Sequence, residues 1–169
     1  ALIPVFLQAQ GTRLLRQPTI SESKIVFVHA NDLWIVDKNG GDAIRLTTST
    51  GVESNPHFSP DGQWIAFTGQ YDGNTDVFVI PVKGGAPKRL TWHPGADIVQ
   101  GWMPDGKSVV FRSGRAGVPT RINQFYQIPA TGGFTEVLAI PRIAFGEISP
   151  DGKYAAYIPI TVWDPDWRK

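Results

Sequence analysis

A short pattern recurs three times along this chain, and this repeat constrains the possible fold more than any other feature. The stretches FSPDGQWIAF, WMPDGKSVVF and EISPDGKYAAY share a Pro-Asp-Gly core. The aspartates of that core are Asp61, Asp105 and Asp151, so the spacing is 44 and then 46 residues. A nearly constant period of this length indicates an array of similar structural units.

Two further anchors repeat with the same period. One is a double glycine and the other is the tripeptide Arg-Leu-Thr. They occupy residues 40–41, 84–85 and 132–133 for the glycines, and residues 45–47 and 89–91 for the tripeptide. Three independent anchors that share one period are hard to obtain by chance, and they indicate that the chain is an array.

Each unit is predicted to contain four short strands. In the second unit these are NPHFS (55–59), WIAFT (64–68), DVFVIP (76–81) and KRLT (88–91). SPDG is predicted to form a tight turn between the first two strands, and GQYDGNT a polar loop between the next two. Apolar and β-branched residues fill the strands, and no window shows the apolar stripe of a helix, so we expect almost no helix.

Four-stranded antiparallel units with this period are typical of β-propeller blades. The predicted fold class is therefore all-β, with about three and a half blades of an incomplete propeller of six or seven blades. Residues 1–10 form a separate extension, and residues 11–169 form the partial propeller. The expected blades are about 17–47, 54–91 and 97–139, with the start of a fourth at about 142–169.

Composition excludes several classes of function. The chain has 169 residues, 41% of them hydrophobic, with 16 Lys and Arg against 15 Asp and Glu. This balance offers no electrostatic basis for binding nucleic acid or an anionic membrane. The absence of cysteine excludes disulfides, thiolate metal sites and a cysteine nucleophile.

The first ten residues, ALIPVFLQAQ, differ from the rest of the chain. A short apolar run followed by small and polar residues resembles the end of a secretory signal peptide, with cleavage near Ala9 or Gln10. The run is too short to span a bilayer. This interpretation predicts a periplasmic or secreted protein, and the alternative is a disordered or strand-like extension.

The repeat resembles TolB-like propeller repeats, which are related to the WD repeat, and more closely the N-terminal propeller of tricorn-like serine proteases. Three stretches carry this resemblance: NDLWIVDKNGGDAIRLT (31–47), the segment from SNPHFSPDG to TWHPGAD (54–97), and WDPDWRK (163–169). The resemblance covers roughly residues 15–169, and its blade motif is specific for fold but weak for function.

The resemblance implies a non-catalytic propeller segment of an exported serine peptidase, which shapes a channel or gate for peptide substrates. The expected partners are peptides or unfolded polypeptides, the remaining blades and the catalytic region of the same protein, and other copies in a homo-oligomer. One alternative is a TolB-like periplasmic scaffold that binds a protein partner and has no activity. Another is an amidohydrolase or prolyl peptidase with an appended propeller.

No catalytic, cofactor-binding or metal-binding residue is predicted within the chain, and no cofactor is expected. The three histidines His29, His57 and His93 fall on a strand end, an innermost strand and a linker, and no G-x-S-x-G motif accompanies them. Their spacing does not suit zinc. The stretch from Asp72 to Asp76 resembles the start of a calcium loop, but its later positions fit a hairpin loop better.

The remaining candidates are interpreted as structural. The three repeated aspartates are expected to form turns, each followed by a glycine with positive φ (Gly62, Gly106 and Gly152). Tryptophans 34 and 64 are expected to pack between blades, and tryptophan 102 to lie in an innermost strand. Tryptophans 163 and 167 are expected to pack onto a continuation of the propeller, or else to form an exposed apolar patch.

Overall fold

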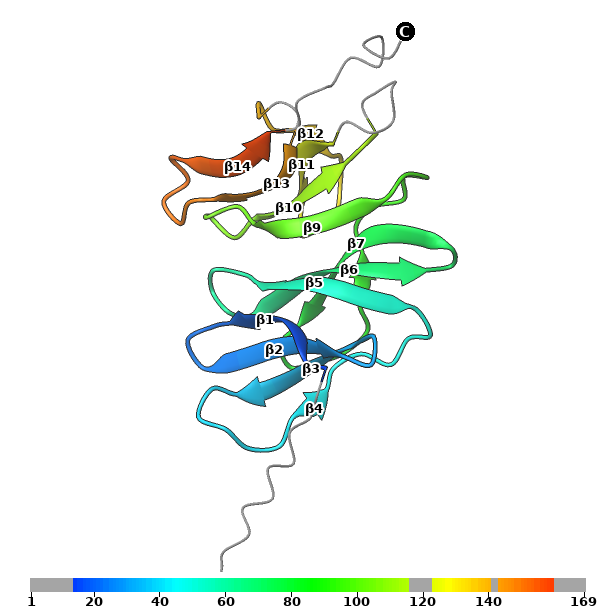
Figure 1. The fold of residues 1–169 in the computed structure, drawn as a ribbon, viewed down its shortest axis with the longest axis vertical. Helices are drawn as coiled ribbons and strands as arrows, with labels where there is room; N and C mark the ends of the chain where they lie inside the picture. The colour runs from blue at the N-terminus through cyan, green and yellow to red at the C-terminus, as the bar shows by residue number, and fades with distance from the viewer. Residues whose placement is uncertain (1–13, 116–122, 141–142, 160–169) are drawn as a thin grey trace, which may run out of the picture.

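All regular structure in the described part of this chain is β-strand. The computed structural model describes residues 14–115, 123–140 and 143–159. These residues form three four-stranded antiparallel sheets and one two-stranded sheet, which follow one another in chain order (Figure 1). The expected all-β class with four-stranded antiparallel units is therefore confirmed. Within the described residues, no helix is long and apolar enough to cross a membrane.

Each sheet is built from strands that are consecutive in the sequence, and we name the sheets blades 1 to 3 and the half-blade. Blade 1 contains β1 (Arg16–Ile20), β2 (Lys24–His29), β3 (Asp32–Asp37) and β4 (Ile44–Arg45). Blade 2 contains β5 (Val52–Phe58), β6 (Trp64–Tyr71), β7 (Asn74–Pro81) and β8 (Lys88–Arg89). Blade 3 contains β9 (Asp97–Trp102), β10 (Ser108–Ser113), β11 (Gln124–Pro129) and β12 (Glu136–Val137). The half-blade contains β13 (Ile143–Ile148) and β14 (Ala155–Pro159).

The middle blade buries both of its faces because its strands are apolar at consecutive positions. Ile65 and Phe67 of β6 belong to the apolar cluster shared with blade 1. Ala66, between them in sequence, belongs to the cluster shared with blade 3. Since neighbouring side chains of a strand point to opposite faces, an unbroken apolar run requires a neighbour on each side. This is why the blades stack face to face.

The Pro-Asp-Gly turns have the backbone geometry that the repeat predicts. Gly62, Gly106 and Gly152 have φ values of 67°, 70° and 72°. The Gly62 amide donates to the Ser59 carbonyl at 2.8 Å, which closes a four-residue turn. The expectation of a positive φ at all three glycines is confirmed.

The prediction of a polar loop between the second and third strands of blade 2 is wrong. β6 and β7 continue toward each other until Tyr71 pairs with Asn74, so only Asp72 and Gly73 remain outside the ladder. Both have positive φ, 52° and 80°, as in the two-residue turns that match the twist of a hairpin. The polar residues that suggested a loop therefore extend the hairpin instead.

The first strands of successive blades lie next to one another. Contacts join β1 to β5, β5 to β9, and β9 to β13. Each of these strands also has an irregularity in its pairing with the second strand, and in β5 this lies between Ser54 and His57. Asn55, within that irregularity, has a φ of 51°. Such bulges bend a strand and increase its twist.

The tryptophans follow the expectation only in part. Trp102 lies in β9, is 9% exposed, and donates from Nε1 to the His57 carbonyl at 2.9 Å, which joins two first strands. Trp64 is 42% exposed, so the expectation that it packs between blades is wrong. Trp34 donates from Nε1 to the His29 carbonyl within its own blade. It alternates along β3 with residues that face blade 2, so its own side chain lies on the other face of the sheet. Tryptophans 163 and 167 lie outside the described residues.

Candidate functional site: the cleft along the first strands

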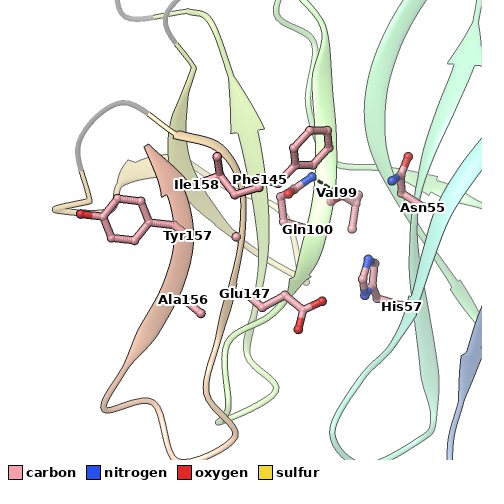
Figure 2. A pocket seen from close by; sticks show the side chains of 10 residues that line it. Asn55, His57, Val99, Gln100, Phe145, Glu147, Ala156, Tyr157 and Ile158 are labelled. Atoms are coloured by element: carbon pink, nitrogen blue, oxygen red, sulfur yellow. Dashed lines mark hydrogen bonds between the residues drawn. The ribbon is translucent and has the colours of Figure 1, made fainter. Parts of the chain in front are cut away.

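The first strands of blades 2 and 3 and the half-blade together line one cleft. It encloses about 580 Å³, within the range of ligand pockets. Polar side chains come from all three sheets: Asn55 and His57 from β5, Gln100 from β9, and Glu147 from β13. Figure 2 shows that His57 and the Glu147 carboxylate point toward each other across this space. We call this space the axial cleft.

The polar groups of the axial cleft include several acceptors for a ligand. Gln100 donates from Nε2 to the Val99 carbonyl at 2.9 Å, which leaves its Oε1 oxygen for another partner. Burial lowers the pKa of the His57 imidazole, and the nearby Glu147 carboxylate acts in the opposite direction without outweighing it. His57 is therefore neutral at pH 7 and can accept through one ring nitrogen.

Apolar groups complete the wall of the axial cleft. Phe145 and Ile158 of the half-blade line it and are 54% and 61% exposed. The Arg112 guanidinium lies 4.6 Å from the centroid of the Phe145 ring and donates to the Ala144 carbonyl at 3.1 Å. These two contacts of Arg112 hold the half-blade against blade 3. The cleft thus combines a polar patch with an apolar one.

A second polar network lies buried in the joint between blades 1 and 2. Glu53 of β5 is 1% exposed, and its side chain accepts from the Leu33 amide, at 3.0 Å, and from the Thr47 hydroxyl. Its other oxygen accepts from the Tyr71 hydroxyl at 2.5 Å. Burial raises the pKa of Glu53, although these donors oppose that shift. The network satisfies polar groups that the joint removes from water, which is a structural role.

The Arg-Leu-Thr tripeptide serves the same purpose in blade 2. Arg89 forms an ion pair with the buried Asp76 at 2.5 Å, and Thr91 accepts from the Val77 amide at 3.0 Å. At the next joint the fully buried Asp97 pairs with Arg115, also at 2.5 Å. Asp76 is thus an ion-pair partner, and the Asp72–Asp76 stretch is a hairpin rather than a calcium loop. Among the described residues, no group of three or more His, Asp or Glu could hold a metal.

The structure separates the three histidines. His57 faces the axial cleft, whereas His93 accepts through Nδ1 from the Gly95 amide at 2.9 Å in the linker after blade 2. His29 ends β2 and packs edge-on against Trp34, with ring centroids 5.8 Å apart. They therefore do not form one site, and we continue to predict no catalytic residue in this chain.

The repeated aspartates act as turn formers, as expected. Asp61 accepts at Oδ1 from the Ser59 hydroxyl at 2.5 Å and from the Gln63 amide at 3.0 Å. The Ser59 hydrogen bond is the main reason why the pKa of Asp61 lies below its usual value. Asp105 and Asp151 accept in the same way from the amides two residues later. None of the three lines the axial cleft.

The sequence did not single out the other polar residues of the axial cleft. Asn55 and Gln100 are ordinary polar positions in strands, and Glu147 precedes the third repeat of the turn motif. The available signal was their shared place on the first strand of each blade. Such strands face the propeller axis, so polar residues there become neighbours although they are distant in sequence.

Comparisons with known proteins agree on the propeller. The sequence model of the tricorn protease N-terminal beta propeller domain family matches residues 12–169. A putative tricorn protease homolog 2 of Streptomyces coelicolor is 44% identical over 55 residues, which are 32% of this chain and 5% of that protein. The crystal structure of the tricorn protease superposes with a TM-score of 0.71 and 26% identity, covering 82% of this chain and 14% of that one.

A protein of a different kind is equally similar in structure. TolB of Acinetobacter baumannii superposes with a TM-score of 0.71 and 26% identity, over 84% of this chain and 36% of that one. The matched regions span only 5%, 14% and 36% of the lengths of these three proteins. The match to the family model, by contrast, covers nearly the whole chain.

Proposed function

Because this chain belongs to the family of tricorn protease N-terminal beta propeller domains, we propose that it lines a channel through which extended peptides reach a remote serine peptidase site. The chain is a propeller scaffold, and its blades stack around a cleft along their first strands. In this proposal the parent protein is exported, its catalytic residues lie outside this chain, and the blades admit or exclude substrates.

The axial cleft is the observation that carries this proposal. A propeller that served only as a spacer would not need open polar groups along its first strands, whereas a channel for peptides does. Asn55, Gln100 and Glu147 supply hydrogen-bonding groups from three successive sheets, and Phe145 supplies apolar surface. An extended peptide presents both kinds of group at short intervals along its length.

A substitution that narrows the cleft in the complete protein tests the proposed channel. Gln100→Trp places a bulky ring in the proposed channel, and Lys107→Trp places the same ring on an exposed turn as a matched control. We expect Gln100→Trp to slow hydrolysis of peptides of about ten residues severalfold, because they must pass the ring. A small ester that diffuses freely should be hydrolysed at the same rate by both variants and by the wild type. The isolated chain, which we expect to be inactive, serves as the blank.

An equal loss of long-peptide and ester hydrolysis in Gln100→Trp would indicate misfolding rather than a narrowed channel. Unchanged hydrolysis of long peptides by a folded variant would reject the channel. The sequence of the complete protein provides a separate check, since a peptidase must continue into a region that contains a catalytic serine.

The second candidate is a binding scaffold without activity, favoured by the equal structural similarity to TolB. In that case the complete protein would contain no catalytic region and would bind a folded protein partner through its loops. It would hydrolyse neither long peptides nor esters, and the substitution at Gln100 would leave partner binding unchanged.

A further inference from the structure

Within the part of the chain that the structure describes, the Glu147 carboxylate of the axial cleft has no cationic partner, and we propose that it binds a protonated amine. The amine would be the α-ammonium group or a lysine side chain of a peptide. Among the described residues that line the cleft, Glu147 alone carries a formal charge at neutral pH, because His57 is held in its neutral form. No lysine or arginine of the described residues forms an ion pair with Glu147.

The neighbouring polar groups suit the remaining hydrogens of an ammonium group. An ammonium group donates three hydrogen bonds and accepts none. Glu147 can accept one of them with the added strength of opposite charge. The free oxygen of Gln100 and the side chains of His57 and Asn55 offer further acceptors around the same space. A carboxylate ligand would instead face the negative charge of Glu147, so the site discriminates against acidic groups.

The apolar wall suits the carbon chain that carries such an amine. Phe145, Val99 and Ile158 line the cleft beside the polar patch, so a lysine side chain could bury its methylene groups against them. Arg112 carries a positive charge beside the Phe145 ring, and its hydrogen bond to the Ala144 carbonyl holds it at the joint. Its charge weakens cation binding without occupying the position of the ligand, so we expect a modest affinity.

The preference for an amine rests on these contacts alone. The further step, that the amine belongs to a peptide, rests on the proposed channel. Three hexapeptides distinguish a side-chain amine from a terminal one. The first has a central lysine and an acetylated amino end, and the second has norleucine and an acetylated amino end. The third has norleucine and a free amino end. Their binding to the complete protein is measured by fluorescence anisotropy. Glu147→Gln removes the charge at constant size, and Glu136→Gln does the same on the outer strand β12.

We expect the wild type to bind one amine-bearing peptide about tenfold more tightly than the acetylated norleucine peptide. A ratio of this size corresponds to one charge-assisted hydrogen bond that is partly exposed to water. Glu147→Gln should abolish this preference and leave the norleucine peptide unaffected, and Glu136→Gln should change nothing. Tighter binding of the lysine peptide would identify a side-chain site, and tighter binding of the free amino end a terminal site.

The proposal is overturned if the wild type binds all three peptides with equal affinity, if Glu147→Gln weakens all peptides equally, or if Glu136→Gln has the same effect. Pentylamine, followed by saturation-transfer NMR, separates this result from failure of the channel. Pentylamine binding that Glu147→Gln removes, without binding of any peptide, would keep the amine site and reject the peptide channel. Absence of pentylamine binding to the wild type would reject the amine site.

Discussion

At the scale of the residue, the repeated turn depends on a backbone conformation that few side chains tolerate. Gly62 has a φ of 67°, in the left-handed region that glycine enters without strain. A Cβ atom added at this position would meet the Ser21 Cβ at 3.6 Å, which is an ordinary contact. Space is therefore available, and the backbone alone explains the glycine.

Gly62→Val should therefore destabilise blade 2 through its backbone. We expect a loss of about 1–3 kcal/mol in the free energy of unfolding, because a β-branched residue is strained at positive φ. Urea unfolding of the complete protein, followed by tryptophan fluorescence, measures it. Gly62→Asn is the matched control, since asparagine tolerates this conformation and should lose much less. Equal losses in both variants would mean that contacts, rather than the backbone, require glycine at this position.

At the scale of the element, the joints between blades combine apolar packing with a few buried carboxylates. Glu53 belongs to blade 2, but two of its partners, Leu33 and Thr47, belong to blade 1 or directly follow it. Tyr71, its third partner, belongs to its own sheet. A buried side chain bonded to groups on both sides ties the position of one blade to the next, because displacement would leave polar groups unpaired.

Glu53→Ala should loosen the joint between blades 1 and 2. The hydroxyls of Thr47 and Tyr71 lose their acceptor and a cavity forms, so we expect a loss of roughly 2–4 kcal/mol. Hydrogen exchange of the peptide that covers β3 should accelerate, with the exchange of β10 in blade 3 as an internal control. Glu53→Gln, which keeps the size and one acceptor, should have a smaller effect. Uniform acceleration across all blades would contradict a role confined to this joint.

At the scale of the whole molecule, the half-blade leaves large apolar side chains exposed to solvent. Among the described residues it pairs only β13 with β14, whereas the other sheets have four strands. Tyr157 and Ile158 of β14 are 44% and 61% exposed. An unpaired strand edge beside exposed apolar side chains is a template for pairing with another chain.

The isolated 169-residue chain should therefore self-associate or be only weakly stable. Sedimentation at low micromolar concentration, combined with thermal melting, provides the measurement. Tyr157→Lys together with Ile158→Lys should reduce association, because charges on an edge strand oppose pairing. A compact monomer with a sharp cooperative melt would show that these blades are stable without further partners.

The fold could be predicted from the sequence because its signals are local. A turn such as Ser-Pro-Asp-Gly sets its own backbone angles within four residues, and recurrence at one period then implies repeated units. The prediction failed where a local signal had two meanings. Asp72 and Gly73 suit a polar loop as well as a two-residue turn, and only the ladder from β6 to β7 decides between them.

The site depended on tertiary structure in a way that no local signal could supply. Glu147 and His57 meet across the axial cleft because three sheets stack with their first strands side by side. Nothing in the spacing of these two residues distinguishes them from other polar strand positions. The blades follow from the sequence alone, since turn geometry and strand alternation act over a few residues. The grouping of polar side chains in the cleft and the joints arises only when the sheets stack, because it depends on the packing of blades that are far apart along the chain.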